Sequence, residues 1–119
     1  MLKFYGYAKC STCRKAKSQL VAMGHTLKEI DIATDPPTKP LLKAILRSGD
    51  YQPRDLFNTS GQVYRKLNLK DTVNSMGQDE LIELLAGNGM LVKRPVVTDG
   101  RRYTVGGDPE RLGGVWGGS

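Results

Sequence analysis

The chain has 119 residues, of which 39% are hydrophobic and 25% charged, and its formal net charge is +6. This size predicts one domain, and the composition is typical of a folded globular protein rather than a disordered one. No apolar run is long enough to cross a membrane, and the first residues lack the apolar core of a signal peptide. We therefore expect a cytoplasmic protein with no membrane association, where paired cysteines are more often catalytic, sensory or metal-binding than structural.

The first third of the chain predicts a strand, a helix and a second strand. Residues 2–7 alternate and are rich in aromatics, apolar residues recur at helical spacing from Cys13 onward, and Gly24 is typical of a helix end. Residues 25–32 form the second strand-like run. Because strands joined by a helix normally run parallel, we expect Cys10 at the carboxyl end of the first strand and the start of the helix.

The middle of the chain predicts helices. Thr38 is a candidate N-cap for a helix that ends at Gly49, and a short turn follows Pro53. Ser75 and Gln78 match the capping-box pattern ahead of an apolar helical run.

The last third predicts a β-hairpin and a short final helix. Residues 90–97 and 101–105 are strand-like runs joined by a turn that contains Asp-Gly, and Asp108 with the following proline is typical of a helix start. Pro95 lies inside the first run, where it lacks the amide hydrogen that a central strand needs. On this pattern alone the Arg94–Pro95 bond is expected to be trans, since only about 5–6% of such bonds are cis.

Both cysteines lie in the segment YAKCSTCRKAK, residues 7–17, which carries several positive charges and no acidic residue. Unpaired backbone N–H groups at a helix start, together with nearby cations, stabilise a thiolate. We therefore predict that Cys10 is the nucleophile and that Cys13, one turn later, is the resolving thiol that closes a Cys10–Cys13 disulfide.

Other interpretations of this segment stay open. Structural zinc normally takes four cysteine or histidine ligands and only His25 could join the two thiols, so no metal site is predicted. The thiols could also be an inert pair, because CxxC is a short pattern. The positive charge could be an ordinary solvated face, and no motif or aromatic basic platform indicates direct nucleic-acid binding.

Three ordered segments, YGYAKCSTCRKAK, LFNTSGQVYRKLNL and GMLVKRPVVTDGRRYTVG, resemble the ArsC/Spx family over almost the whole chain, and its short Spx/MgsR-type members most of all. The resemblance implies an α/β, thioredoxin-like (glutaredoxin-like) fold with a mixed four-stranded sheet. It places the thioredoxin-like part at about residues 1–35 and 89–117 and a helical insertion at about 36–88, within a single domain of residues 1–119.

The resemblance also implies roles for individual residues. Pro95 would be cis and face the active cysteine, and Arg94 would bind an anion or stabilise the Cys10 thiolate. Of the three arginines that bind the oxyanion in the arsenate-reductase branch only Arg94 is matched, because Asn58 stands at the second position and the third falls near residues 105–107. Candidate substitutes are Arg54 and Arg102. The other residues predicted to bind substrate or an anion are Ser11, Thr12 and Arg14.

Three functions are consistent with these observations. The first is a thiol–disulfide redox protein that binds no cofactor and uses glutathione or a thioredoxin- or glutaredoxin-type protein as reductant. The second is an Spx-like redox-sensing regulator that binds the C-terminal domain of the RNA polymerase alpha subunit. The third is a glutathione- and glutaredoxin-dependent arsenate reductase. Whether the chain is an oxidoreductase or a non-enzymatic switch is left open, and we expect a monomer.

Overall fold

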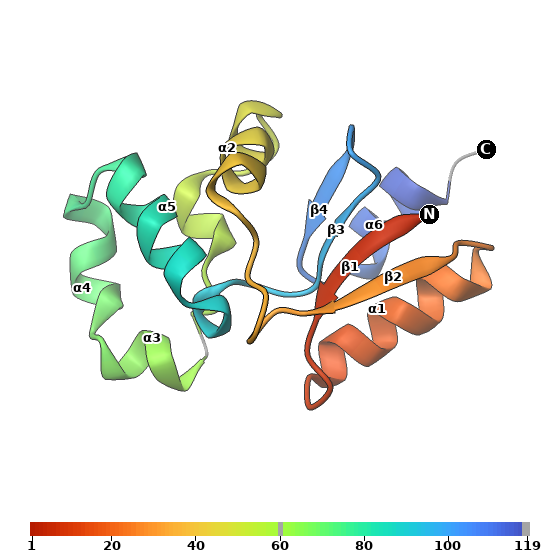
Figure 1. Ribbon diagram of the computed structural model, residues 1–119, viewed down its shortest axis with the longest axis horizontal. Helices are drawn as coiled ribbons and strands as arrows, with labels where there is room; N and C mark the ends of the chain where they lie inside the picture. The colour runs from red at the N-terminus through yellow and green to blue at the C-terminus, as the bar shows by residue number, and fades with distance from the viewer. Residues whose placement is uncertain (60, 118–119) are drawn as a thin grey trace. The chain divides into compact units, whose positions relative to one another are not determined.

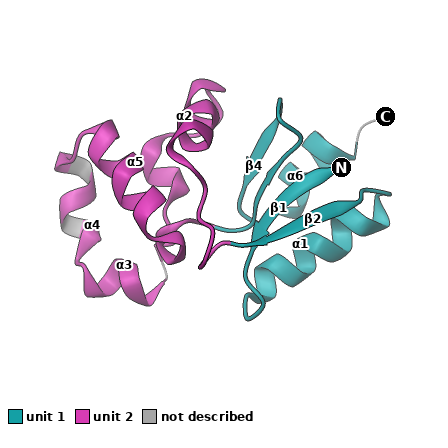
Figure 2. Cartoon of the chain, viewed as in Figure 1, with its two compact units in different colours: residues 1–31, 94–119 teal, residues 32–93 magenta. Residues whose placement is uncertain are grey.

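The computed structural model describes residues 1–59 and 61–117, which form two compact units. The first unit combines residues 1–31 with residues 94–119, and the second contains residues 32–93 (Figure 2). In the sequence, the second unit is therefore an insertion into the first.

The first unit is a four-stranded mixed sheet with two helices (Figure 1). The strand order is β2-β1-β3-β4, in which β1 and β2 are parallel and β3 is antiparallel to both β1 and β4. The elements are β1 (Leu2–Gly6), α1 (Ser11–Ala22), β2 (Leu27–Asp31), β3 (Val96–Thr98), β4 (Tyr103–Val105) and α6 (Pro109–Trp116). This is the α/β, thioredoxin-like arrangement that the sequence resemblance implies.

Helices α1 and α6 pack on the same face of this sheet. Leu2 and Phe4 of β1 share one buried cluster with Leu20 of α1 and with Leu112 and Trp116 of α6. Each leucine buried in this way stabilises the fold by about 1.5–3 kcal/mol. The cluster therefore holds the start of α1, which carries the cysteines, in a constant position against β1.

Local signals determine where α1 starts and ends. Cys10 is its N-cap, with an extended backbone, and Met23 is its C-cap. Gly24 follows with φ 93°, a left-handed conformation that glycine adopts without a steric penalty. The predicted end of this helix is confirmed.

The predicted hairpin is present but shorter than expected. Strands β3 and β4 are antiparallel, whereas Gly89–Leu91 forms a 3-10 helix and Val92 makes only an isolated bridge with Phe57. The prediction of a strand over residues 90–95 is therefore wrong. The reason is that the backbone of this stretch pairs with the Phe57 segment inside the second unit instead of extending β3.

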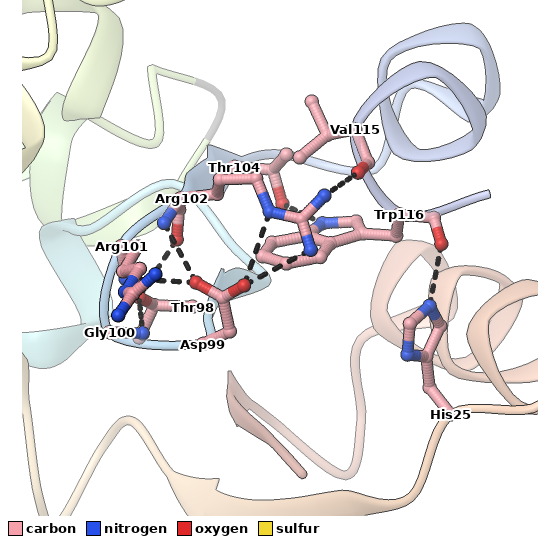
Figure 3. A network of polar contacts seen from close by, with 9 residues as sticks. All are labelled: His25, Thr98, Asp99, Gly100, Arg101, Arg102, Thr104, Val115 and Trp116. Atoms are coloured by element: carbon pink, nitrogen blue, oxygen red, sulfur yellow. Dashed lines mark hydrogen bonds and ion pairs between the residues drawn. The ribbon is translucent and has the colours of Figure 1, made fainter. Parts of the chain in front are cut away.

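A polar network fastens the hairpin to α6 (Figure 3). The Arg102 guanidinium donates to the Asp99 carboxylate at 3.1 Å and to the Val115 carbonyl at 2.7 Å, and it lies 4.9 Å from the centroid of the Trp116 ring. The Trp116 indole N–H donates to the Thr104 hydroxyl at 3.0 Å. The guanidinium of Arg102 is thus engaged in holding α6 rather than presented to an anion.

The second unit is helical. Its elements are α2 (Lys39–Arg47), η1 (Pro53–Leu56), α3 (Gln62–Lys66), α4 (Leu69–Thr72), η2 (Val73–Ser75), α5 (Gln78–Gly87) and η3 (Gly89–Leu91), where η denotes a 3-10 helix. Helix α2 packs on α5 and buries Leu42, Ile45 and Leu85 completely. No helix within residues 1–59 and 61–117 has both the length and the apolar character needed to span a bilayer.

The predicted caps of this unit have different outcomes. The Thr38 hydroxyl accepts the N–H of Leu41 at 3.3 Å, so the predicted N-cap of α2 is confirmed. The prediction of a capping box formed by Ser75 and Gln78 is wrong, because Gly77 is the N-cap of α5. Ser75 ends a preceding 3-10 turn, and its hydroxyl donates to the Thr72 carbonyl at 2.8 Å instead.

Candidate functional site

Cys10 lies at the start of α1, where the first backbone N–H groups of a helix have no partner within the helix. Its sulfur accepts a hydrogen bond from the backbone N–H of Cys13 at 3.2 Å. The N–H of Cys10 donates to the Tyr7 carbonyl at 3.1 Å, which closes the loop before the helix. The Cys10 side chain is half-buried. The sulfur of this half-buried residue therefore has a hydrogen-bond donor aimed at it.

Cys13 has a different environment, because only 3% of the residue is exposed. Burial raises the pKa of Cys13 to about 12, and the hydrogen bond and charge of Cys10 act in the same direction. The backbone of Tyr7 and the charge of Arg94 lower this pKa, but their effect is smaller. Neither cysteine is in a disulfide. The pair therefore consists of one half-buried cysteine and one buried thiol with a raised pKa.

Arg94 and Pro95 lie at the entrance to β3, beside the cysteine loop. The Arg94–Pro95 peptide bond is cis, as the family resemblance implies, so the trans expectation from the residue pattern is wrong. The Arg94 guanidinium carbon lies 5.6 Å from the centroid of the Tyr7 ring, in cation–π geometry. Because the Tyr7 carbonyl also accepts the N–H of Cys10, the arginine and the cysteine loop share one neighbour.

Ser11, Thr12 and Arg14 are exposed in the first turn and a half of α1. A Cβ atom at Gly107 would collide with the methyl group of Thr12, so the chain after β4 passes directly against this turn. Backbone therefore fills the space beside Thr12, at the position where the arsenate-reductase branch is expected to carry its third arginine. The second position, Asn58, belongs to the other compact unit.

A cavity of about 350 Å³ opens beside Cys13, wholly within the first unit. Its walls come from β1, α1, β2 and the loop after β1, and they include Phe4, Tyr7, Cys13, Arg14 and Asp31. Lys17 and Glu29 form an ion pair at 2.9 Å in the same wall. The cavity has the size of a small-ligand site and combines an apolar wall with charges of both signs next to the buried thiol.

Several of these neighbours were missed by sequence reasoning. Tyr7 read as part of a strand, and the Lys17–Glu29 pair joins α1 to β2 across 12 positions. The Nε2 atom of His25 is hydrogen-bonded to the Trp116 carbonyl at 2.6 Å (Figure 3). The only sequence signal for the ion pair was the opposite charge of residues in α1 and β2. No local signal indicated the histidine contact.

No group of three histidine, cysteine or acidic side chains that could hold a metal ion occurs in residues 1–59 and 61–117. His25 contacts Trp116 edge to face, with ring centroids 6.2 Å apart. The histidine therefore packs against the last helix of the first unit.

Residues 5–115 match the model of the ArsC family. The chain belongs to the ArsC family. It is 48% identical over 115 residues to the uncharacterized protein YusI of Bacillus subtilis. This match covers 97% of this chain and 98% of YusI. It is also 32% identical to the regulatory protein MgsR of the same organism, over 93% of this chain and 86% of MgsR.

The solved structures agree with this assignment. A protein from Streptococcus mutans UA159, described as "a possible arsenate reductase", has a TM-score of 0.82 and 42% identity. The match covers 89% of this chain and 90% of that protein. This ArsC-family chain is therefore similar both to an arsenate-reductase-like protein and to a regulatory one.

Proposed function

We propose that this ArsC-family chain is a thiol–disulfide redox protein in which Cys10 is the nucleophile and Cys13 the resolving thiol. The observation that supports this most strongly is the pairing of a half-buried Cys10, whose sulfur accepts the Cys13 N–H at 3.2 Å, with a buried thiol one turn later. A backbone donor aimed at sulfur favours its negative charge, and the thiolate is the form that attacks disulfides.

In the first step, the Cys10 thiolate attacks one sulfur of a substrate disulfide R–S–S–R′. A Cys10–S–S–R bond forms, the substrate S–S bond breaks, and R′–S⁻ leaves. The Arg94 cation lies next to this loop, over Tyr7, and would stabilise negative charge on the attacking sulfur or on an anionic substrate.

In the second step, Cys13 loses its proton to the departing thiolate or to water and attacks the Cys10 sulfur, so that R–S⁻ leaves and the Cys10–Cys13 disulfide forms. Burial is the largest cause of the raised pKa of Cys13, and the hydrogen bond and the charge of Cys10 raise this pKa further. Both disappear once Cys10 is bound in a mixed disulfide. The resolving thiol is therefore activated by the adduct that it must resolve.

Two electrons pass from the thiol pair to the substrate in this sequence. An external dithiol, or glutathione as two molecules, must then reduce the Cys10–Cys13 disulfide, and a thioredoxin- or glutaredoxin-type protein is the partner we propose. No bound cofactor takes part in any step.

Trapping the intermediate tests this function. Incubated with oxidised glutathione, Cys13→Ser should accumulate a mixed disulfide on Cys10, seen by intact-mass spectrometry, whereas the unmodified protein should lose two hydrogens and carry no adduct. Cys10→Ser is the matched control and should form neither product. Equal adduct formation by both single variants would contradict the assigned order.

A second candidate is a redox-sensing regulator, which the similarity to MgsR favours. Here the Cys10–Cys13 disulfide would switch binding to the C-terminal domain of the RNA polymerase alpha subunit. Retention of purified polymerase or of that domain by the reduced or the oxidised protein, but not by both, is the expected result. No retention in either state would remove this candidate.

A third candidate is arsenate reduction, which the similarity to the Streptococcus mutans protein favours. Arg94 would then be the one matched arginine of the three that bind the oxyanion in that branch. Asn58 and the chain near Gly107 stand where the other two arginines are expected. Each missing charge-assisted contact costs about 1.5–3 kcal/mol, so we expect weak turnover. Sustained turnover with glutathione and glutaredoxin that Cys10→Ser abolishes would support this candidate, and no turnover at millimolar arsenate would remove it.

A further inference from the structure

A second cavity, of about 320 Å³, lies wholly within the helical unit and contains neither cysteine. Its walls come from η1 and the residues after it, from α3 and α4, and from the end of the unit. Three of its lining residues are cations, namely Arg54, Lys70 and Lys93. Segments far apart in the sequence therefore bring positive charge to one hollow.

None of these cations has a carboxylate partner among the side chains that the structure describes. Asp55 is the carboxylate among the described wall residues, and its Oδ2 atom accepts the backbone N–H of Gln52 at 2.8 Å. Among the acidic side chains that the structure describes, which leave out Asp71, none forms an ion pair with Arg54, Lys70 or Lys93. The hollow consequently has a positive potential that favours an anion.

Backbone pairing fixes two of the cations relative to each other. The N–H of Lys93 donates to the Leu56 carbonyl at 2.7 Å, and the N–H of Asn58 donates to the Leu91 carbonyl at 2.7 Å. Arg54 lies in the 3-10 turn that leads into the first of these paired segments. The side chains of Arg54 and Lys93 thus start from backbone positions that hydrogen bonds hold near the same cavity.

Neutral donors and an aromatic wall complete the cavity. Thr59 and Tyr64 both line it and carry hydroxyl groups. The Tyr64 ring packs against Phe57 with centroids 6.1 Å apart, and Phe57 is only 3% exposed. Tyr64 is therefore held in place by a buried partner at the edge of the cationic hollow.

We propose that this pocket binds a small phosphate monoester, with the phosphate group held by Arg54, Lys70 and Lys93. A phosphate monoester carries close to two negative charges and three terminal oxygens, which match three cations and two hydroxyl donors better than a single carboxylate does. The aromatic wall of Tyr64 accommodates the ester substituent, and the volume suits a ligand of this size. The pocket is separate from the thiols in the sequence and does not depend on their chemistry.

The test uses the full chain with ¹⁵N-labelled backbone, titrated with inorganic phosphate and with phenyl phosphate at constant ionic strength. We expect saturable shifts of the amides of Arg54, Thr59, Lys70 and Lys93, with tighter binding of phenyl phosphate. Combining Lys70→Ala with Lys93→Ala should weaken binding about 10-fold or more. Arg65→Ala removes an exposed cation of α3 outside the cavity and should leave the affinity unchanged.

Three results would overturn the proposal: no saturation with either ligand, an equal loss of affinity in Arg65→Ala and in the double lysine variant, or binding of a nucleic-acid oligomer alone. A protein carrying both Cys10→Ser and Cys13→Ser should bind phenyl phosphate normally. Failure of the thiol chemistry and failure of this site are therefore distinguishable.

Discussion

The backbone N–H of Cys13 is hydrogen-bonded to the sulfur of Cys10 at 3.2 Å, while the sulfur of Cys13 itself is buried. One residue thus supplies a hydrogen-bond donor to the proposed nucleophile and holds its own thiol out of solvent. The proposed redox function rests on this difference between the two sulfurs rather than on the short CxxC pattern.

The first prediction concerns the alkylation of the two thiols. With a pKa of about 12, Cys13 has a thiolate fraction of about one in ten thousand at pH 8. Iodoacetamide should therefore modify Cys10 first, with Cys13 at least about 100-fold slower, as measured by peptide mass spectrometry across pH 6–9. In guanidinium chloride both cysteines should react alike. Equal rates in the folded protein would contradict the assignment.

The second prediction concerns Arg94, whose charge lies over Tyr7 beside the cysteine loop. Arg94→Met should slow the reaction of Cys10 with an anionic aromatic disulfide about 10-fold, and with a neutral dipyridyl disulfide by less, because the lost interaction is electrostatic. Arg94→Lys should recover part of the rate with the anionic reagent. Arg101→Ala, an exposed arginine in the hairpin turn, is the control and should react normally. An identical loss with both reagents would indicate a structural effect instead.

The third prediction compares two glycines near the end of α5. A Cβ atom at Gly89 would collide with the backbone carbonyl of Ile32, whereas a Cβ at Gly87 meets open space. Gly89→Ala should therefore lower the free energy of unfolding by about 3 kcal/mol or more, since backbone cannot move aside cheaply. Gly87→Ala should change it by between about 0 and +1 kcal/mol. Urea unfolding followed by circular dichroism measures both, and similar values for the two variants would refute the close approach.

The fourth prediction concerns the pH dependence of the network around Arg102. Burial alone would raise the pKa of Asp99, but the N–H groups of Arg102 and Arg101 and the Arg102 guanidinium lower it to about 2. Because the folded-state pKa lies below the unfolded one, this carboxylate stabilises the fold above about pH 4 and loses that contribution as the pH falls towards 2.

Asp99→Asn should accordingly cost about 1 kcal/mol at neutral pH, a modest value because the pair is partly exposed. The gap between this variant and the unmodified protein should close between pH 4 and pH 2, with unfolding followed by Trp116 fluorescence. Asp35→Asn, at an exposed position, is the control and should show no such gap. A gap that stays constant down to pH 2 would show that the carboxylate charge is not responsible.

The sequence by itself determined the features that depend on neighbours in the chain. The start of α1 at Cys10, its end before Gly24, the Thr38 cap and the Asp-Gly hairpin turn could all be predicted, because caps and turns are made by residues a few positions apart. The candidate nucleophile followed from the same local logic, since the start of a helix is visible in the sequence.

Tertiary structure alone decided the features that depend on partners distant in the chain. Residues 90–95 have the composition of a strand, but Val92 bridges to Phe57, so the strand begins only after Pro95. Burial by the cluster on the sheet raises the pKa of Cys13. Arg102 is hydrogen-bonded to the Val115 carbonyl and lies over the Trp116 ring, both in α6. Burial and long-range pairing arise only when separate segments meet, so no pattern of adjacent residues encodes them.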